Sequence, residues 1–171
     1  MRATGNETSV DKYRFAVINQ QPVFRKQANL VRKIGFMDLL KELAASFPAE
    51  QLKTKPVDRY AYASDASFYT LVPAAVVFPA NIQEVQQLLQ ITAKHTTTIT
   101  FRAAGTSLSG QSVTDGILAD ISKHWRKCTV LDDGSTVKVQ PGIIGNTVNH
   151  YLRPYGTKIG PDPASINSAM M

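Results

Sequence analysis

The sequence predicts an α+β fold, in which a small parallel βαβ unit precedes a mostly antiparallel part. The first observation is that an apolar run at residues 75–78, a helical pattern and a β-type run at residues 98–101 follow one another. A strand–helix–strand unit of this length is a crossover connection, so we expect its two strands to be parallel. The second observation is a pair of β-type runs, residues 128–131 and 136–140, on either side of a hairpin-turn sequence.

Composition limits the size and class of the protein. Its 171 residues fit one domain, or one domain and part of another, and an apolar content of 43% supports a packed core. The sequence has no apolar run of membrane-spanning length and no signal-peptide core, and its single cysteine, Cys128, excludes a disulfide framework. We therefore expect a cytoplasmic protein in a reducing compartment.

Residues 1–34 lack a sustained periodicity and hold much of the basic charge of a chain whose net charge is +6. We predict a basic flexible arm over residues 1–34, followed by a domain over residues 35–171. A basic arm can contact nucleic acid or an anionic membrane surface. Because the arm lacks regularly interleaved aromatic residues, we expect no nucleic-acid partner. The arm is either a solvent-exposed, partly disordered segment or, as an open alternative, a site of peripheral contact with the inner membrane.

The first predicted helix begins after Gly35, where apolar residues recur at helical spacing until Pro48 ends the pattern. Those apolar residues are Phe36, Leu39, Leu40, Leu43 and Phe47. Residues 51–72 are mixed, with three tyrosines around Ser64 and Asp65. We expect them to form an irregular segment that wraps the core.

The βαβ unit has the clearest boundaries. The apolar run at residues 75–78 suits a strand covered on both faces, and Pro79 ends it. Asn81 can cap the next helix, because Glu84 follows three residues later as in a capping box. The face of this helix toward the core is predicted to carry Ile82, Val85, Leu88, Leu89 and Thr92.

The later elements follow from similar patterns. A further strand is predicted at residues 116–121, before the hairpin. The helix after the hairpin should end at Pro154 and Gly156. Its apolar face is formed by Ile144, Val148 and Leu152. Residues 160–163, Gly-Pro-Asp-Pro, are expected to make a rigid turn.

The most informative stretch is the small-residue loop after the strand at residues 98–101. Residues 102–112 have few bulky side chains that would keep a ligand away from the backbone. Backbone amides and the hydroxyls of Thr106, Ser107 and Ser109 can converge on an anion. We therefore expect this loop to bind a phosphate-bearing ligand. The alternative is an ordinary loop between two strands.

The same loop differs from two known nucleotide-binding motifs. Gly105 to Ser112 has the pattern G-x-x-x-x-G-Q-S, in which neutral Gln111 stands where a P-loop needs lysine. Residues 113–116 resemble a turn, whereas a P-loop is followed directly by a helix. The dinucleotide motif G-x-G-x-x-G is absent. A nucleoside triphosphatase is therefore disfavoured.

Arg102 and Asp162 are further candidate binding residues. Arg102 can neutralise a phosphate or pin the loop through its planar guanidinium, and the alternative is a surface arginine. Asp162 lies between two prolines that fix the backbone on both sides; the alternative is a tight turn with nothing bound. The three histidines and Cys128 share no metal-ligand spacing, so we predict no metal site in this chain.

Five segments, in this order, resemble the FAD-binding domains of the vanillyl-alcohol oxidase / PCMH type. They are residues 102–111, 116–121, 139–142, 148–149 and 160–165. The likeness is strongest to FAD-linked D-lactate dehydrogenases and covers about residues 55–171. The resemblance implies the PCMH-type FAD-binding fold, with a small parallel βαβ subdomain, the start of a mostly antiparallel α/β subdomain, and FAD held between them.

The resemblance also implies a cofactor site. The loop from Arg102 to Ser112 would wrap the FAD diphosphate with its amides, and a second strip would lie near the flavin and the diphosphate. The residues implied are Arg102, Ala103, Ala104, Gly105, Thr106, Ser107, Leu108, Ser109, Gly110, Gln111, Ser112, Pro161, Asp162 and Ser165. Thr106 stands where some relatives have a histidine bonded to the flavin. Threonine cannot form that bond, so FAD should be non-covalent.

Two departures from the family pattern carry their own expectations. Ala103 and Ala104 replace glycines of many relatives, and a Cβ disfavours positive φ, so Gly105 and Gly110 must supply any left-handed backbone. Relatives also continue into further FAD contacts and a substrate-binding cap domain with the catalytic residues. We therefore expect this chain to be the N-terminal part of a larger enzyme, and no catalytic residue can be assigned in it.

The resemblance implies an enzyme that oxidises a D-2-hydroxyacid, in the first place D-lactate, and passes the electrons to a further acceptor. Long relatives carry an iron–sulfur module further along. The presence of an iron–sulfur cluster in that later part of the enzyme therefore stays an open alternative. This chain alone should be inactive and bind FAD weakly. The alternative is a non-enzymatic nucleotide- or anion-binding module, which ADP or phosphate would occupy as well as FAD does.

Overall fold

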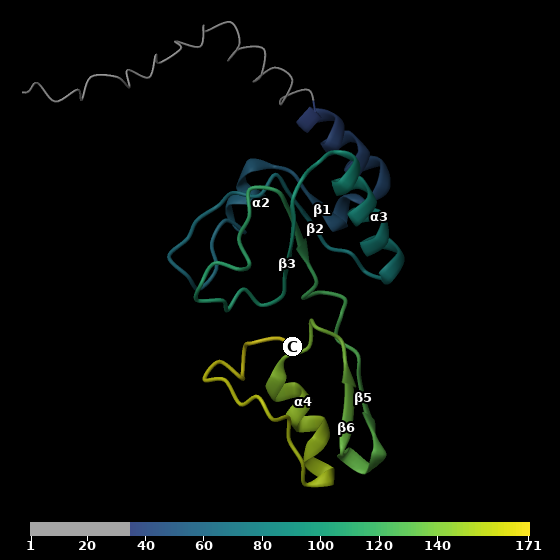
Figure 1. Ribbon diagram of the computed structural model, residues 1–171, viewed down its shortest axis with the longest axis vertical. Helices are drawn as coiled ribbons and strands as arrows, with labels where there is room; N and C mark the ends of the chain where they lie inside the picture. Colours follow the sequence, from purple (N-terminus) through teal and green to yellow (C-terminus); the bar gives the residue numbers. More distant parts are fainter. Residues whose placement is uncertain (1–34) are drawn as a thin grey trace, which may run out of the picture. The chain divides into compact units, whose positions relative to one another are not determined.

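The computed structural model of this chain describes residues 35–171, and the predicted basic arm over residues 1–34 lies outside the described residues (Figure 1). The first described element is a helix over residues 35–46, which ends before Pro48 as predicted. The side chains of Leu39 and Leu43 are buried in the core. None of the helices that the structure describes is long and apolar enough to cross a membrane.

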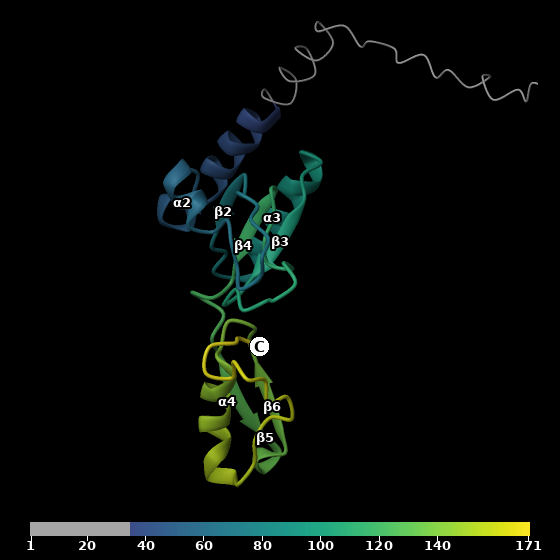
Figure 2. The ribbon, with the colours of Figure 1, turned by 90° about the vertical axis from the view of Figure 1, so that its left-hand side faces the viewer.

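A four-stranded sheet follows, with the strand order β1-β2-β4-β3. Its strands are β1 (Leu52–Lys53), β2 (Ala75–Val77), β3 (Ile99–Arg102) and β4 (Ile117–Asp120). β4 is parallel to both β2 and β3, whereas β1 is antiparallel to β2. The predicted parallel crossover is confirmed, and β4 lies between its two strands (Figure 2).

Both faces of this sheet are covered, which explains the wholly apolar sequence of β2. On one face, Ala75 and Val77 pack with the first helix and with α3 (Ile82–Lys94). On the other face, Val76 and Phe78 pack with Leu118 and with the half-buried Tyr62. The rings of Tyr62 and Phe78 meet edge to face, with 5.9 Å between their centroids.

α3 begins with the predicted capping box. The Asn81 Oδ1 accepts a hydrogen bond from the Glu84 amide at 2.9 Å, and the Glu84 carboxylate accepts one from the Ala80 amide at 2.7 Å. The first bond satisfies an amide that the first turn of a helix leaves without an intrahelical partner, and the second holds the residue before the cap against the helix start.

The buried face of α3 differs from the prediction. Leu88, Ile91 and Thr92 are buried, whereas Ile82 is 60% exposed and Leu89 is 43% exposed. Residues spaced by three and four share one face of a helix, but adjacent residues are rotated by about 100°. Here the core-facing side is centred near Leu88 and leaves Leu89 at its exposed margin, and the sequence pattern does not decide between the two.

Residues 51–72 hold more regular structure than predicted. They include β1 and the short helix α2 (Pro56–Tyr60), with a proline in the first turn of the helix. Each element is too short for a hydrophobic period to appear in its sequence. The remainder, residues 61–72, is irregular apart from an isolated bridge, as expected.

The second part of the fold is the predicted hairpin with a helix against it. β5 (Cys128–Leu131) pairs antiparallel with β6 (Thr136–Val139). α4 (Gly145–Leu152) packs on the hairpin through the buried Val148 and Leu152. A 3-10 turn at Arg153–Tyr155 and a left-handed Gly156 with φ of 68° end the helix, as predicted.

The turn expected at residues 160–163 lies elsewhere. Residues 161–163 form no turn, and the turn covers residues 164–168, where the Ile166 amide donates to the Pro163 carbonyl at 2.8 Å. A proline has no amide hydrogen to donate, so Pro161 and Pro163 cannot close a hydrogen-bonded turn before Ala164. The prolines therefore precede the turn rather than form it.

Candidate functional site

The small-residue loop lies where a parallel sheet places its ligands. Residues 103–116 connect the carboxyl end of β3 to β4, and ligands of open parallel sheets bind outside the carboxyl ends of the strands. No helix follows the loop, because the chain continues directly into β4. This arrangement agrees with the sequence argument against a P-loop.

Two glycines give the loop its shape. Gly105 has a φ of 69° and Gly110 a φ of 74°, in the left-handed region that disfavours a Cβ. Ala103 and Ala104 do not adopt positive φ. The prediction that Gly105 and Gly110 alone supply the left-handed backbone of this loop is confirmed.

The first half of the loop presents unused amides. Within residues 35–171, no hydrogen-bond acceptor is found for the backbone amides of residues 103–108. The amides of Ser109 and Gln111, by contrast, donate to Ser107 Oγ at 3.2 and 3.3 Å. A run of amides without acceptors is the arrangement that binds an anion through backbone groups.

Two of the loop hydroxyls have internal partners instead of facing outward. The Ser107 hydroxyl donates to Gln111 Oε1 and accepts the two amide bonds, so it ties the second half of the loop together. The buried Ser112 hydroxyl donates to Asp65 Oδ2 at 2.7 Å. The side chains of Ser107 and Ser112 therefore shape the loop through these internal hydrogen bonds.

Arg102 lies against the loop and is not an isolated surface arginine. Its Nη1 donates to the carbonyl oxygens of Ser64 at 2.9 Å and Tyr62 at 3.2 Å, and its guanidinium lies 5.6 Å from the centre of the Tyr62 ring. A Cβ on Gly105 would come within 2.5 Å of the Arg102 Nη2. Of the two roles that the sequence leaves open, these contacts support pinning of the loop.

The sequence reasoning missed the segment that holds the loop. The Ala66 amide donates to the Gly105 carbonyl at 3.0 Å, and the Asp65 carboxylate accepts bonds from the Ser112 hydroxyl and, at 2.9 Å, from the Ser67 amide. Burial raises the pKa of Asp65, but these hydrogen bonds outweigh it and lower that pKa to about 2. The only available signal was an aspartate two residues before a serine, which is typical of an Asx turn.

Residues 161–165, predicted as a second contact strip, are not joined to the loop by any hydrogen bond or ion pair within the described residues. Pro161 and Asp162 are exposed, and the Asp162 carboxylate pairs with Lys158 Nζ at 2.7 Å. The Ser165 carbonyl accepts from the Ser168 amide at 2.8 Å and so belongs to the turn at residues 164–168. Within the described residues, no hydrogen bond or ion pair connects residues 161–165 with residues 102–112.

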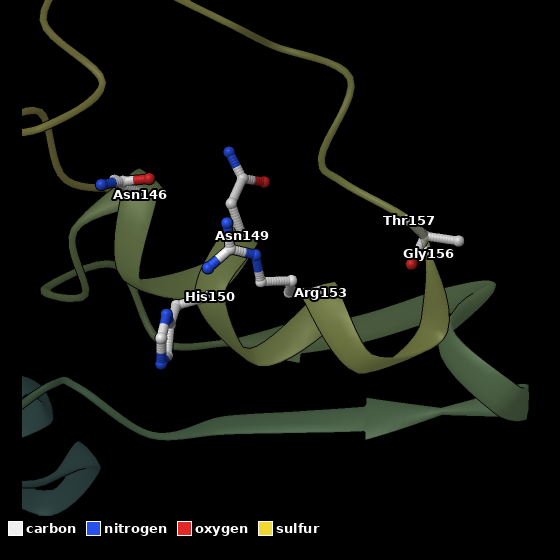
Figure 3. A pocket seen from close by; sticks show the side chains of 6 residues that line it. All are labelled: Asn146, Asn149, His150, Arg153, Gly156 and Thr157. Carbon is white, nitrogen blue, oxygen red and sulfur yellow. The ribbon is translucent and has the colours of Figure 1, made fainter.

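A separate polar cavity of about 430 Å³ lies beside α4. It is lined by Asn146, Asn149, His150, Arg153, Gly156 and Thr157 (Figure 3). The Asn149 side chain accepts a hydrogen bond from the Ile159 amide at 2.9 Å, and the Thr157 hydroxyl donates to the Gly134 carbonyl at 2.9 Å. Neither the loop nor the second strip contributes to this cavity.

Two of the remaining chemistry-bearing residues, His95 and Trp125, have structural partners. His95 Nε2 lies 2.8 Å from Glu42 Oε2, and the Trp125 indole donates to the Pro79 carbonyl at 2.6 Å. Burial raises the pKa of the half-buried Cys128 thiol. Residues 35–171 contain no group of three or more His, Cys, Asp or Glu side chains that could hold a metal ion.

Residues 73–171 match the family model described as "FAD binding domain". The chain is 30% identical over 139 residues to D-2-hydroxyglutarate dehydrogenase of Escherichia coli, with 79% of this chain and 14% of that protein covered. It is 30% identical to glycolate oxidase subunit GlcD of Bacillus subtilis, covering 75% and 28%. It is 32% identical to mitochondrial D-lactate dehydrogenase [cytochrome] of Kluyveromyces lactis, covering 53% and 17%.

Solved structures share the fold. An alkyldihydroxyacetonephosphate synthase aligns with a TM-score of 0.65 at 23% identity, over 78% of this chain and 27% of that one. A p-cresol methylhydroxylase with bound substrate aligns with a TM-score of 0.59 at 16% identity, over 71% and 25%. The chain thus spans about one seventh of the D-2-hydroxyglutarate dehydrogenase it matches, and about a quarter of these structures.

Proposed function

This chain belongs to the FAD-binding domain family of PCMH type, and from this premise we propose that its loop from Arg102 to Ser112 holds the diphosphate of FAD in a D-2-hydroxyacid-oxidising enzyme. The observation that carries the proposal is the run of amides at residues 103–108 that have no acceptor within residues 35–171. A diphosphate offers many acceptor oxygens and no donors, so it matches a set of donors that lacks acceptors.

The residues of the loop fit a diphosphate in shape and in charge. Gly105 and Gly110 carry no side chain, and their positive φ values turn the backbone where a Cβ would be strained. The guanidinium of Arg102 lies beside Gly105 and brings a permanent positive charge to the loop. No acidic residue occurs between Arg102 and Ser112.

FAD, when bound, supplies the acceptor for the hydride that leaves the α-carbon of the substrate. The contribution of this chain is to bind and orient the cofactor. The loop amides fix the diphosphate, and the contacts of Arg102 and Asp65 keep those amides in place. Thr106 has no nucleophilic nitrogen, so we propose that FAD is held non-covalently.

We propose further that Pro161, Asp162 and Ser165 form a second contact strip for FAD. Asp162 is already paired with Lys158, so its carboxylate is not an unmatched charge that would repel a diphosphate. The exposure of Pro161 and Asp162 leaves their backbone accessible to a ligand. No residue of this chain is proposed as a catalytic acid or base.

The substrate proposal is a D-2-hydroxyacid, with D-lactate as the substrate that the sequence resemblance favours. The relatives' names add D-2-hydroxyglutarate and glycolate as candidates. The choice is tested by measuring how fast the protein, in the length in which it is naturally produced, reduces an electron-acceptor dye with each of the three acids as substrate. D-lactate should give the highest kcat/KM. A higher value with D-2-hydroxyglutarate would contradict the proposal that D-lactate is the preferred substrate.

The cofactor proposal is tested by titrating the chain with FAD and following flavin fluorescence. We expect saturable but weak binding, and no hydroxyacid oxidation by the chain alone. Tight stoichiometric binding would contradict the view that other segments complete the site. If ADP or inorganic phosphate protected the fold against heat as well as FAD does, an anion-binding module would replace the flavin proposal.

A further inference from the structure

We propose that Asp65 is a positioning residue for the cofactor: it joins the segment at residues 65–67 to the end of the loop at Ser112 and so holds the amides of residues 103–108 toward the diphosphate. This inference rests on the proposed function. It concerns a residue that lies outside the loop and has no counterpart in the sequence motif that predicted the site.

The contacts of Asp65 connect two segments that are distant in the sequence. Its Oδ2 accepts the Ser112 hydroxyl at 2.7 Å, and its Oδ1 accepts the Ser67 amide at 2.9 Å. Ser112 is buried and closes the loop, 47 residues further along the chain. One carboxylate therefore fixes the position of the far end of the loop relative to its own turn.

A second connection completes the clamp at the near end of the loop. The Ala66 amide, next to Asp65, donates to the Gly105 carbonyl at 3.0 Å. The Ser64 carbonyl, on the other side of Asp65, accepts the Arg102 guanidinium at 2.9 Å. Residues 64–66 thus contact the loop at its start, at its first left-handed glycine and at its end.

The orientation of these bonds matters for ligand binding. The Gly105 carbonyl accepts from Ala66, so it is turned toward that segment and away from a ligand on the amide side. A peptide carbonyl facing a diphosphate would repel it, because the carbonyl oxygen carries a partial negative charge and the diphosphate a full one. Without Asp65, the turn at residues 65–67 loses the acceptor that fixes it, and the direction of the Gly105 carbonyl is no longer set.

Three variants separate this role from a general loss of stability. In Asp65→Ala both acceptor contacts are lost, and in Ser112→Ala only the connection to the loop is lost. In Asp65→Asn an oxygen can still accept the Ser67 amide, and the side-chain NH₂ can donate to Ser112, whose hydroxyl also accepts. Asp115→Ala is the matched control, since Asp115 is an exposed aspartate just beyond the same loop.

The experiment measures FAD affinity of the full chain by fluorescence titration, at a temperature where circular dichroism shows each variant to be folded. Asp65→Ala and Ser112→Ala should each weaken FAD binding about tenfold, the size of one lost charge-assisted hydrogen bond. The double variant should lose hardly more than either single one, because both remove the same connection. Asp65→Asn should recover most of the affinity, and Asp115→Ala should match the unchanged chain.

The two proposals fail in different ways. If the unchanged chain binds FAD but Asp65→Ala binds it equally well, the positioning role is wrong and the proposed function stands. Additive losses in the double variant, or no recovery in Asp65→Asn, would likewise overturn the connection through Ser112. If the unchanged chain does not bind FAD at all, the proposed function fails, and the positioning role fails with it.

Discussion

At the scale of single residues, the shape of the loop depends on two glycines that have no Cβ atom. Gly105 combines a φ of 69° with the Arg102 guanidinium so close that a Cβ would lie 2.5 Å from Nη2. Gly110 combines a φ of 74° with the Tyr69 ring, which a Cβ would approach to 2.6 Å. Left-handed glycines can be expected here from the sequence. That Tyr69 lies next to Gly110, and that the Arg102 side chain is held next to Gly105, depends on how the segment before β2 folds.

Gly105→Ala should therefore reduce both stability and FAD affinity. The strained backbone costs about 1–3 kcal/mol of unfolding free energy, and the displaced guanidinium disturbs the amide surface. Gly156→Ala is the control, because Gly156 has a similar φ of 68° but open space around it. Urea unfolding should show a loss in both variants, whereas only Gly105→Ala should lose FAD affinity. An equal loss of affinity in both would contradict the argument.

The pH dependence of stability should contain a contribution from Asp65. Its pKa falls from the usual 3.8 to about 2 in the folded chain, so the carboxylate stabilises the fold in full above 3.8 and loses this effect as the pH falls through 2. The difference in unfolding free energy between the unchanged chain and Asp65→Asn should be constant near neutral pH and shrink across that acidic window. Urea titrations at several pH values measure it, and a difference that grows on acidification would contradict the assignment.

At the scale of elements, α3 shows how far a periodic pattern leads. Its start at Asn81 and its end near His95 follow from capping and composition, and the structure agrees with both. Its buried face does not follow from the sequence, because Leu88 and Leu89 are both apolar and only Leu88 is buried in the structure. The choice is made by the sheet and the first helix, which bury Leu88 together with Ile91.

Substitutions on α3 should separate the two leucines. Leu88→Ala should cost about 2–5 kcal/mol of unfolding free energy, because the side chain is fully buried and leaves a cavity. Leu89→Ala should stay within about 0.5 kcal/mol, since that side chain is 43% exposed. Urea unfolding of both variants is the measurement, and similar costs would mean that the helix face is assigned wrongly.

The cap of α3 gives a second prediction at this scale. Asn81→Ala removes the acceptor of the Glu84 amide and should cost about 1 kcal/mol. Asn167→Ala is a suitable control, because Asn167 is exposed and its side chain makes no hydrogen bond within residues 35–171. A smaller cost for Asn81→Ala than for Asn167→Ala in urea unfolding would contradict the capping box.

Other elements lay beyond what the sequence could predict. β1 has two residues and α2 has five, so neither shows a period. The position of β4 between β2 and β3 depends on pairing between strands far apart in the chain, which local patterns do not encode. The two prolines favour a turn at residues 160–163 from sequence alone, whereas the structure has the turn at residues 164–168.

At the scale of the whole molecule, the fold and the cofactor were predictable because five motifs occur in one order. The support of the loop was not, since a carboxylate in a mixed segment has no motif that links it to Ser112. The chain spans 14% of a D-2-hydroxyglutarate dehydrogenase. The activity of the whole enzyme is therefore a proposal, whereas the cofactor loop can be tested in this chain itself. Among the described residues, no hydrogen bond or ion pair connects that loop with residues 161–165.

Mass action gives a test at this scale. FAD that binds only the folded chain should stabilise it by about 2.7 kcal/mol at a concentration of one hundred times Kd. Thermal unfolding at rising FAD concentration should therefore show a midpoint that keeps increasing. Riboflavin, which lacks the diphosphate, should give a much smaller increase at equal concentration. An equal increase with riboflavin would mean that the diphosphate is not the group the chain recognises.

The most direct measurement is an amide ¹H–¹⁵N correlation spectrum of the labelled chain during titration with FAD. If the amides of residues 103–108 hold the diphosphate, their resonances should show the largest shifts, and ADP should move the same resonances. Shifts that leave residues 103–108 unchanged and gather instead at the cavity beside α4 would contradict the account.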